Sequence, residues 1–515
     1  MRWRRAQTPI LAALTLLVLG IAVYHAAGVT RPNSDPASTA GGDPVAPSAV
    51  YATVDPTPAG SPLPTGFLGL SLEYSALEAY TGADPARPDP VFVQLLRNLG
   101  GVGGNLSLRI GGNSTDSTWW PVSGMSAPAG VTYGLTPGWL ASARALASGL
   151  GAKLILGVNL AAGRPRLTAA EADALLTGVG VDNVAALELG NEPDVYSVFP
   201  WYRNHRKPVF ARGAGYNLDA FLAEAHRSAA TLPAVPLAGP ASAELPWLSA
   251  VPALLAAEPR LRMVTVHRYP IQGCLHNRRS PSYPSIANLL SDRSSAGMAT
   301  ALSPYIAAAH TRGLQFRVDE LNSAALAGCL GRTGVSNTFA SALWMLDTLF
   351  DLASVGVDGV NIHSLPGAAY EVFTFRRTAG GWQAFVHPDY YGMLMFAQAF
   401  PPGAQLLPVH VPAGPVKVWA TRDPEGRTRV ALINKDSRPH TVELQLAPAL
   451  GQAEIEWLRA PGAGATSGVT LGGQTFGAET ATGRFAGLPA AQPVSQLLGS
   501  YSINLPAYSA ALLTR

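Results

Sequence analysis

Cysteine, charge and long apolar runs are all scarce in this chain, and each scarcity excludes a class of protein. Two cysteines in 515 residues are too few for a disulfide scaffold or a cysteine-based zinc site. Charged residues make up 13% of the chain, its formal net charge is +3, and no basic block follows the extreme N-terminus, so we expect no nucleic-acid partner. With 48% hydrophobic residues, the chain can still form the large core of a barrel-sized domain with a smaller partner.

The long apolar run that is present lies at the N-terminus. Three arginines within the first five residues precede an apolar stretch over residues 10–23, a pattern typical of a secretory signal. The run is also borderline in length for an uncleaved membrane span. We therefore predict that residues 1–29 are a signal peptide or an N-terminal membrane anchor, tethered in the second case through residues 10–24. In both cases we expect the rest of the chain to be exported, to the periplasm, the extracellular space or the outer face of the membrane.

A repeating pattern of strands and helices fills most of the chain. Eight short apolar runs, each followed by a helical pattern, cover residues 66–75, 107–114, 153–161, 187–192, 236–242, 263–270, 315–322 and 359–367. Eight strand–helix units in this order predict an α/β fold, namely a (β/α)8 TIM barrel over residues 66–402.

The two ends of the chain have a different pattern. After residue 402, alternating apolar runs broken by turn residues predict a C-terminal antiparallel β-sandwich domain over residues 403–515. The segment 49–65 begins with the same alternation, and we expect it to contribute a strand to that sandwich. Residues 30–48, rich in Pro, Ser, Gly and Ala, are predicted to be a flexible linker.

Two glutamates end apolar strands in matching contexts. Glu192 lies in LELGNEPDVY at the end of the fourth predicted strand, and Glu320 lies in FRVDELNSA at the end of the seventh. Barrel enzymes keep their chemistry at the carboxyl ends of the strands. Glycoside hydrolysis needs two carboxyl groups, because one protonates the leaving oxygen while the other attacks or activates water. We therefore predict that Glu192 and Glu320 are catalytic, and that strand alternation points the neighbouring Asp319 into the helix layer.

Further polar side chains lie at or near the same strand ends. Asn191 is predicted to bond the sugar 2-hydroxyl, a contact that strengthens in the transition state. His267 and Tyr269 end the sixth strand, and a tyrosine hydroxyl beside Glu320 would hold that carboxylate ionised. Arg109 either pairs with a catalytic carboxylate or supports its own strand. We find no metal-ligand cluster and expect no metal and no cofactor.

The two cysteines, Cys274 and Cys329, fall in the loops after the sixth and seventh predicted strands. In an exported chain, a pair of cysteines at one face of the barrel predicts a disulfide. Two free buried thiols are the alternative.

Taken together, these motifs resemble one family. SLRIGGNSTD, LELGNEPDVY, VTVHRYPIQG, VDELNSA, SNTFASALWMLDTLF and HPDYYGMLMF look like glycoside hydrolase family 79, which contains β-glucuronidases and heparanases. The resemblance extends from about residue 50 to the C-terminus. It implies a retaining mechanism with Glu192 as the acid/base and Glu320 as the nucleophile.

The resemblance also implies contacts to a sugar carboxylate. SLPGAAYEVF, after the eighth strand, is similar to a glycine-rich turn of the family in which backbone amides and a tyrosine meet that carboxylate. The corresponding residues are Gly367, Ala368 and Tyr370, although alanine at 368 departs from the glycine that is usual there. Glu73 on the first strand and Asp116 after the second match positions that line the sugar site in relatives.

The sequence thus predicts an exported retaining exo-β-glucuronidase that acts on a β-glucuronide or another uronic-acid-containing glycan. Two alternatives are an endo-acting, heparanase-like enzyme on uronic-acid polysaccharide and a relative that acts on xylosides or arabinosides. A third, from a different class, is a non-catalytic carbohydrate-binding protein. The presence of both glutamates with Asn191 argues against the third, since binding alone requires no acid/base pair.

Overall fold

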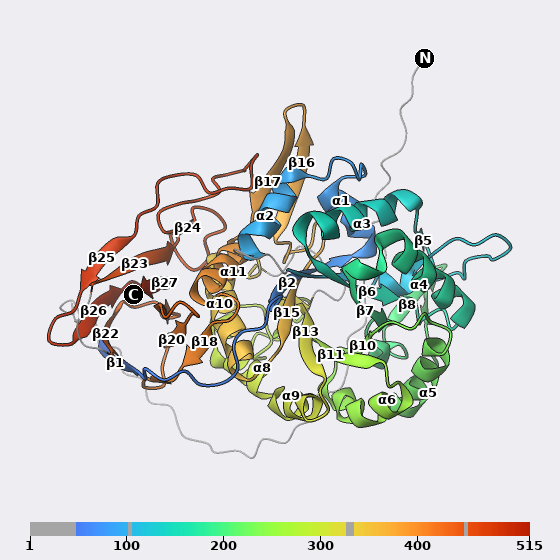
Figure 1. Ribbon diagram of the computed structural model, residues 1–515, viewed down its shortest axis with the longest axis horizontal. Coiled ribbons are helices and arrows are strands. Elements are labelled where there is room, and N and C mark those ends of the chain that lie inside the picture. Colours follow the sequence, from blue (N-terminus) through green and yellow to red (C-terminus); the bar gives the residue numbers. More distant parts are fainter. Residues whose placement is uncertain (1–47, 101–105, 326–333, 448–451) are drawn as a thin grey trace.

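The computed structural model describes residues 48–100, 106–325, 334–447 and 452–515. These residues form a barrel of strands ringed by helices and, beside it, a β-sandwich (Figure 1). The predicted signal or anchor segment, together with the linker up to residue 47, lies outside the described residues. In the part of the chain that is described, no helix is long and apolar enough to cross a membrane.

Eight parallel strands close the barrel, and the predicted (β/α)8 fold is confirmed. Hydrogen bonding joins the first strand to the last, and most strand residues are buried because one face meets the helices while the other fills the interior. The strands are β2 (Leu68–Glu73), β3 (Ser107–Gly111), β6 (Lys153–Val158), β7 (Val184–Leu189), β10 (Leu237–Ser242), β11 (Leu261–Arg268), β13 (Gln315–Leu321) and β15 (Gly359–Ser364).

Helices follow the strands and cover the barrel. Local chemistry sets their ends: α3 begins after Thr136, whose side chain accepts a hydrogen bond from the Trp139 amide, and ends before Gly151 in the left-handed conformation. The described helices are α1 (Leu77–Thr81), α2 (Pro90–Gly100), α3 (Pro137–Leu150), α4 (Pro165–Val179), α5 (Leu218–Ala229), α6 (Val251–Ala257), α7 (Ile286–Leu289), α8 (Ala296–Thr300), α9 (Ser303–His310), α10 (Phe339–Ser354) and α11 (Pro388–Ala399).

The C-terminal domain is a sandwich of two sheets with an apolar core between them. α10 and α11 lie between the barrel and this domain, so α10 is buried around nearly its whole circumference (Figure 1). One sheet contains β19 (Val409–His410), β1 (Ser48–Val54), β22 (His440–Leu446) and β26 (Ser500–Leu505). The other contains β18 (Gln405–Leu407), β20 (Val416–Arg422), β21 (Thr428–Asn434), β27 (Ser509–Thr514), β23 (Gln452–Arg459), β24 (Thr470–Leu471) and β25 (Gln492–Ser495).

The strand before the barrel belongs to this second domain. β1 pairs in parallel with β22 along its whole length, from Ser48 opposite His440 to Val54 opposite Leu446. In Figure 1 the blue β1 lies among the red C-terminal strands. The sandwich is therefore built from segments that precede and follow the barrel in the sequence.

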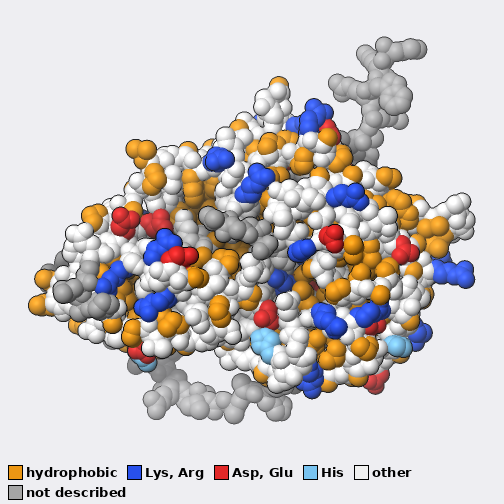
Figure 2. Space-filling view, viewed as in Figure 1, with side chains coloured by type: hydrophobic (Ala, Val, Ile, Leu, Met, Phe, Trp, Pro, Cys, Tyr) orange, Lys and Arg blue, Asp and Glu red, His pale blue; other side chains and the backbone are white. Residues whose placement is uncertain are grey.

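Several loops at the carboxyl ends of the barrel strands contain strand pairs that the sequence analysis did not anticipate. β8 (Pro200–Asn204) and β9 (Lys207–Phe210) form a hairpin after β7, and β16 (Phe373–Thr378) and β17 (Gly381–Val386) form another after β15. Shorter pairs join β4 (Thr118–Trp119) to β5 (Tyr133–Gly134) and β12 (Ile271–Gln272) to β14 (Ala324–Ala325). Charged side chains of both signs are scattered over the face shown in Figure 2, in keeping with the small net charge.

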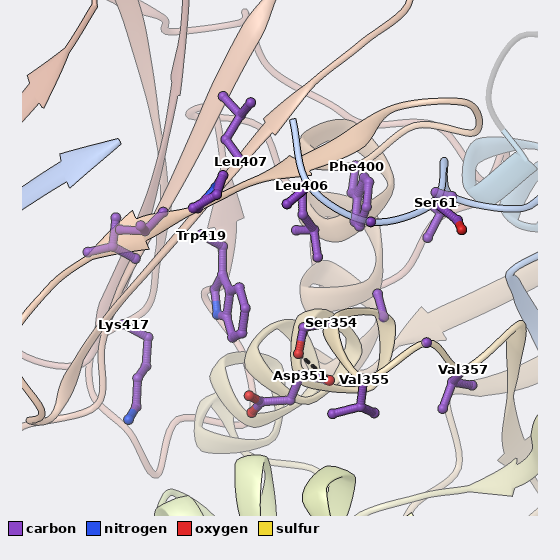
Figure 3. A pocket seen from close by; sticks show the side chains of 18 of the residues that line it. Ser61, Asp351, Ser354, Val355, Val357, Phe400, Leu406, Leu407, Lys417 and Trp419 are labelled. Carbon is purple, nitrogen blue, oxygen red and sulfur yellow. Dashed lines mark hydrogen bonds between the residues drawn. The ribbon is translucent and has the colours of Figure 1, made fainter. Parts of the chain in front are cut away.

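A cavity of about 780 Å³ lies where the barrel meets the sandwich, with Phe400, Leu406 and Trp419 among its walls (Figure 3). Its barrel-side walls are residues 59–64, which lead toward β2, and the turn between α10 and β15. These segments enter the amino ends of barrel strands, whereas barrel enzymes keep their chemistry at the carboxyl ends. The cavity is therefore separate from the candidate active site.

Candidate active site

The turn after β7 places Glu192 over the end of the barrel. Gly190 has a φ of 76°, and a Cβ atom there would lie 2.4 Å from the Tyr196 hydroxyl, so glycine is required. Glu192 itself has a φ of 49° and a ψ of 56°, a left-handed conformation that is uncommon for such a side chain. Its amide donates to the Ala241 carbonyl at 2.9 Å. Unusual backbone conformations of this kind cluster at functional sites, where the surrounding structure holds them.

Glu192 is paired with a histidine. The Nδ1 atom of His267, from β11, lies 2.8 Å from Oε1 of Glu192, and the histidine side chain is fully buried. Burial by itself lowers the pKa of His267, but the Glu320 carboxylate and the bond to Glu192 raise it to about 9. The ring is therefore charged at neutral pH and donates to Glu192. His267, predicted beside Glu320, lies 3.8 Å from that residue and makes its hydrogen bond to Glu192 instead.

Glu320 is surrounded by donors that favour its ionised form. Its Oε1 accepts a hydrogen bond from the Tyr269 hydroxyl at 2.7 Å, and its Oε2 accepts one from the Arg109 guanidinium at 2.7 Å. Nδ1 of His363, on β15, is 3.8 Å from Oε2. Burial opposes ionisation, but His363, His267, Arg109 and the Tyr269 bond together hold the pKa of Glu320 well below its ordinary value. These contacts favour the anionic form of Glu320, which is the form that a nucleophilic carboxyl group requires.

The two glutamates lie close together. One carboxylate oxygen of Glu192, one of Glu320 and a ring nitrogen of His267 all lie within 4.8 Å of one another. Retaining glycosidases hold their two carboxyl groups about 5–5.5 Å apart, whereas inverting enzymes hold them about 6.5–9.5 Å apart. Glu192, Glu320 and His267 also have the spacing of metal ligands. A cation there would share Glu320 with the Arg109 guanidinium, so the donor set fits a hydrogen-bonded acid pair better than a metal.

Arg109, on β3, joins the parts of the site to one another. Its side chain is fully buried and donates to Glu188 at 2.8 Å, to Glu320 at 2.7 Å, to the side-chain carbonyl of Asn191 at 3.0 Å and to Ser71 at 3.2 Å. Of the two roles considered from the sequence, the structure shows pairing with the carboxylate of Glu320. The Nδ2 atom of Asn191 donates to the side chain of Asn113 at 3.2 Å, so its amide is held from both ends.

The prediction that Asp319 points into the helix layer is wrong. Its carboxyl group is fully buried and lies 3.0 Å from Nε of Arg109 inside the barrel. The reason is a β-bulge: Val266 pairs with Val318 but His267 pairs with Glu320, so Asp319 is an extra residue in its strand. A bulge breaks the alternation of side chains, which lets Asp319 and Glu320 both face inward.

Asp116, predicted to line the sugar site, is buried and makes its hydrogen bonds to the protein itself. Its Oδ1 accepts hydrogen bonds from the amides of Leu160 and Ala161, both at 3.1 Å. Its Oδ2 accepts from the amide of Asn191 at 3.1 Å and from the hydroxyl of Tyr196 at 2.6 Å. With both oxygens occupied, the carboxylate ties the loops after β3, β6 and β7 together and positions Asn191.

The backbone amides of Gly367 and Ala368 do not form the predicted carboxylate cradle. The amide of Gly367 donates to the Glu371 side chain at 3.0 Å, and that of Ala368 donates to the Leu365 carbonyl at 3.0 Å. A carboxylate of the protein itself therefore occupies the amide predicted to hold the sugar carboxylate.

Tyr370 and Glu73 lie close to Glu320. The Tyr370 ring is 5.9 Å from the Tyr269 ring and 5.8 Å from that of His363. Glu73 ends β2, accepts hydrogen bonds from the amides of Asn113 at 3.0 Å and Ser114 at 2.7 Å, and lies 3.7 Å from Nε2 of His363. Burial raises the pKa of Glu73 above its ordinary value. Both side chains remain candidates for the wall of the sugar site.

The predicted disulfide remains a prediction, because Cys329 lies outside the described residues and only Cys274 is described. Sequence reasoning also missed Glu188, Asn113 and Ser71. A signal for Glu188 was present, since a charged residue in the apolar run of β7 has to be paired when it is buried. Nothing in the local sequence marks Asn113 or Ser71, whose partners come from other strands.

Comparison with known proteins finds a family resemblance in the C-terminal domain. Residues 418–512 match the family model described as the glycosyl hydrolase family 79 C-terminal beta domain. The C-terminal domain is a family 79 β domain. The resemblance predicted from the motifs is thereby confirmed for the part of the chain that the model covers. A comparison with curated proteins gives no match.

Solved structures extend the likeness beyond the family 79 domain. A 4-O-α-L-rhamnosyl-β-D-glucuronidase from Fusarium oxysporum 12S superposes with a TM-score of 0.69 at 20% identity, covering 90% of this chain and 100% of its own. An arabinofuranosidase from Xanthomonas axonopodis pv. citri has a TM-score of 0.62 at 16% identity, and an α-L-arabinofuranosidase from Thermotoga maritima has 0.61 at 13%. Each of these covers 90% of this chain and 99% of its own. At such identities the likeness establishes the fold alone, a (β/α)8 barrel with a β-sandwich domain beside it.

Proposed function

We propose that the protein is a retaining exo-β-glucuronidase. The observation that carries the proposal is the pair of carboxyl groups. Glu320 accepts hydrogen bonds from Arg109 and Tyr269, which favour its ionised form, and one of its oxygens lies within 4.8 Å of an oxygen of Glu192. A non-catalytic lectin has no use for a buried carboxylate held beside a second carboxyl group in this way. The family 79 domain and the likeness to the Fusarium glucuronidase support a glucuronide as the substrate.

In the first step, Glu192 protonates the glycosidic oxygen while Glu320 attacks the anomeric carbon. The bond from His267 to Oε1 of Glu192 leaves Oε2 free to carry the proton. The aglycone leaves with that proton, and a covalent bond joins the sugar to Glu320. Asn191 has a second N–H beyond the one bonded to Asn113, and this donor is available for the sugar 2-hydroxyl.

In the second step, water cleaves the covalent intermediate. Glu320 has then lost its charge to the ester bond, so the negative charge beside Glu192 is gone and Glu192 acts as the base. It takes a proton from water, which attacks the anomeric carbon from the side the aglycone left. Arg109 and Tyr269 stabilise the Glu320 carboxylate as it is released. Two displacements at one carbon return the original β configuration.

Hydrolysis of a panel of aryl glycosides tests the proposal. The wild type should hydrolyse the β-D-glucuronide and should not hydrolyse the β-glucoside, β-xyloside or α-arabinofuranoside. NMR of the reaction should show the β anomer of the released sugar as the first product. Glu320→Gln should lower kcat/KM at least about a thousandfold, in line with losing a nucleophile. Glu192→Gln should be rescued by azide, which attacks without a general base, and the product should be the β-glycosyl azide.

Other outcomes would identify the alternatives. Turnover of the xyloside or the arabinofuranoside alone would refute the glucuronide. No turnover of any aryl glycoside, together with depolymerisation of a uronic-acid polysaccharide, would favour the endo-acting enzyme. Glu320→Gln with undiminished activity would refute the assignment of the nucleophile.

We also propose that the catalytic part acts outside the cytoplasm, on the basis of the apolar N-terminal run at residues 10–23. Fractionation of cells that express the full chain should find the activity outside the cytoplasm. A chain without residues 1–29 should stay inside and remain active, and export of that shortened chain would contradict the proposal.

A further inference from the structure

Four buried polar atoms beneath Glu320 have no hydrogen-bond partner among the described residues. They are Oε1 of Glu188, both side-chain oxygens of Asp319 and Nε2 of His267. The side chains of all three residues are 0% exposed. Buried polar atoms are nearly always paired, because leaving one unpaired costs its full desolvation. Four such atoms in one cluster therefore require an explanation.

The bonds of Arg109 show which carboxyl group lacks a donor. Its Nε carries one proton, which it donates to Oε2 of Glu188 at 2.8 Å. Oδ2 of Asp319 lies 3.0 Å from the same nitrogen but accepts no hydrogen bond. Three of the four other guanidinium protons go to Glu320, Asn191 and Ser71, and neither oxygen of Asp319 accepts a hydrogen bond from the described residues. Asp319 as a buried carboxylate would thus have no donor, which is an unfavourable state for an anion.

We propose that Asp319 is a positioning residue that carries a proton and donates it to Oε1 of Glu188. The two carboxyl groups both lie at Nε of Arg109, Glu188 at 2.8 Å and Asp319 at 3.0 Å, and a bond between two acids needs one proton. Oδ1 of Asp319 is 3.7 Å from Nε2 of the charged His267 and can accept from it after a small movement. The proton on Asp319 then pairs one of its oxygens with Oε1 of Glu188, and the N–H of His267 pairs the other oxygen, so all four atoms gain partners. The proposal rests on the proposed function to the extent that Glu320 is the nucleophile.

The charges that face Asp319 support a neutral acid. Glu188 faces it from β7, Arg109 from β3 and His267 from β11, while Arg317 lies two residues before it in β13. Burial and the Glu188 carboxylate raise the pKa of Asp319 well above its ordinary value, and Arg109 and His267 do not reverse this.

A neutral Asp319 has a consequence for Glu320. Glu188 and Glu320 are then the two anions that share the Arg109 guanidinium. An ionised Asp319, 3.0 Å from Nε, would compete for that charge and loosen the hold of Arg109 on Glu320. The proton on Asp319 therefore keeps the nucleophile in place.

Infrared difference spectroscopy on the full chain tests the proton directly and needs no substrate. The spectrum of the wild type minus that of Asp319→Asn at neutral pH should show the carbonyl stretch of a protonated carboxylic acid, which the variant lacks. Asparagine is the suitable replacement because it keeps the shape of that acid and its amide donates to Glu188. Loss of an ionised carboxylate band in its place would overturn the proposal. Since the spectrum requires no turnover, it distinguishes failure here from failure of the proposed function.

Kinetics on the best aryl glycoside then tests the positioning role. Asp319→Leu, which has similar size but no polar atom, should lower kcat/KM at least about thirtyfold and move the acid limb of its pH profile upward. Asp319→Asn should restore kcat/KM to within about tenfold of the wild type, and the acid limb of its pH profile should return to the wild-type position. Asp358→Asn, a control at a largely buried acid paired with His310 outside the site, should leave both kcat/KM and the acid limb unchanged. If Asp319→Asn is as impaired as Asp319→Leu while both remain folded, a negative charge is required and the proposal is wrong.

Discussion

Replacing Tyr269 by phenylalanine removes one hydrogen-bond donor from Glu320 and little else. The hydroxyl donates to Oε1 at 2.7 Å, and a hydrogen bond to a charged group contributes about 1.5–3 kcal/mol. Because about 1.36 kcal/mol corresponds to one pH unit, the pKa of Glu320 should rise by about 1–2 pH units. The direction follows from the ionised form, which the hydroxyl stabilises and the variant does not. His363, His267 and Arg109 remain, so Glu320 should still be ionised at neutral pH.

The assay is the pH dependence of kcat/KM, measured with whichever aryl glycoside the wild type hydrolyses. In Tyr269→Phe the acid limb should move upward by about 1–2 pH units, since that limb reports ionisation of the nucleophile in the free enzyme. Tyr305→Phe, on α9 at the barrel periphery, is the matched control and should leave the profile unchanged. An unmoved acid limb in Tyr269→Phe, or an equal movement in the control, would refute the reasoning.

Two further predictions concern stability. Gly190→Ala places a Cβ atom 2.4 Å from the Tyr196 hydroxyl at a φ of 76°, so urea melts should show that the free energy of unfolding falls by about 1–3 kcal/mol. The control Gly213→Ala has open space around it and should lower that free energy by less than about 0.5 kcal/mol. Equal losses would show that the turn tolerates a side chain. The pKa of His267 is raised from 6.5 to about 9. Its contribution to the free energy of unfolding is therefore fully present below pH 6.5 and declines as the pH rises toward 9, and the whole decline should be about 3 kcal/mol. His267→Gln should abolish that part of the pH dependence, and an unchanged slope would contradict the charged form.

Local patterns were sufficient for most of the fold. Each barrel strand was recognisable as a short apolar run before a helical pattern, since burial on both faces leaves few polar positions within a strand. The hairpin of β16 and β17 was missed although its signal was present. FTFRRT and GWQAFV alternate around a glycine-containing turn, which is a hairpin pattern.

The candidate catalytic pair, Glu192 and Glu320, was also recognisable locally, because a carboxyl group at the end of an apolar barrel strand has few structural reasons to be there. The predicted surroundings were less accurate. Asp116 is predicted to line the sugar site, and its carboxylate accepts from two other loops, after β6 and β7, whose approach no local pattern reveals. The amide of Gly367 was assigned to a sugar carboxylate, yet Glu371, four residues later, occupies it.

The sequence by itself determined the eight strand–helix units, the alternating strands of the sandwich and the positions of Glu192 and Glu320. These features depend on side-chain periodicity and on residue types within one segment, which the chain carries wherever it folds. Only the tertiary structure decided the direction of Asp319, because the bulge in β13 arises from its register against β11 and β15. It also decided the ionisation of Glu320 and His267, since burial and charges from different strands set those equilibria, and such distances exist only once the barrel has closed.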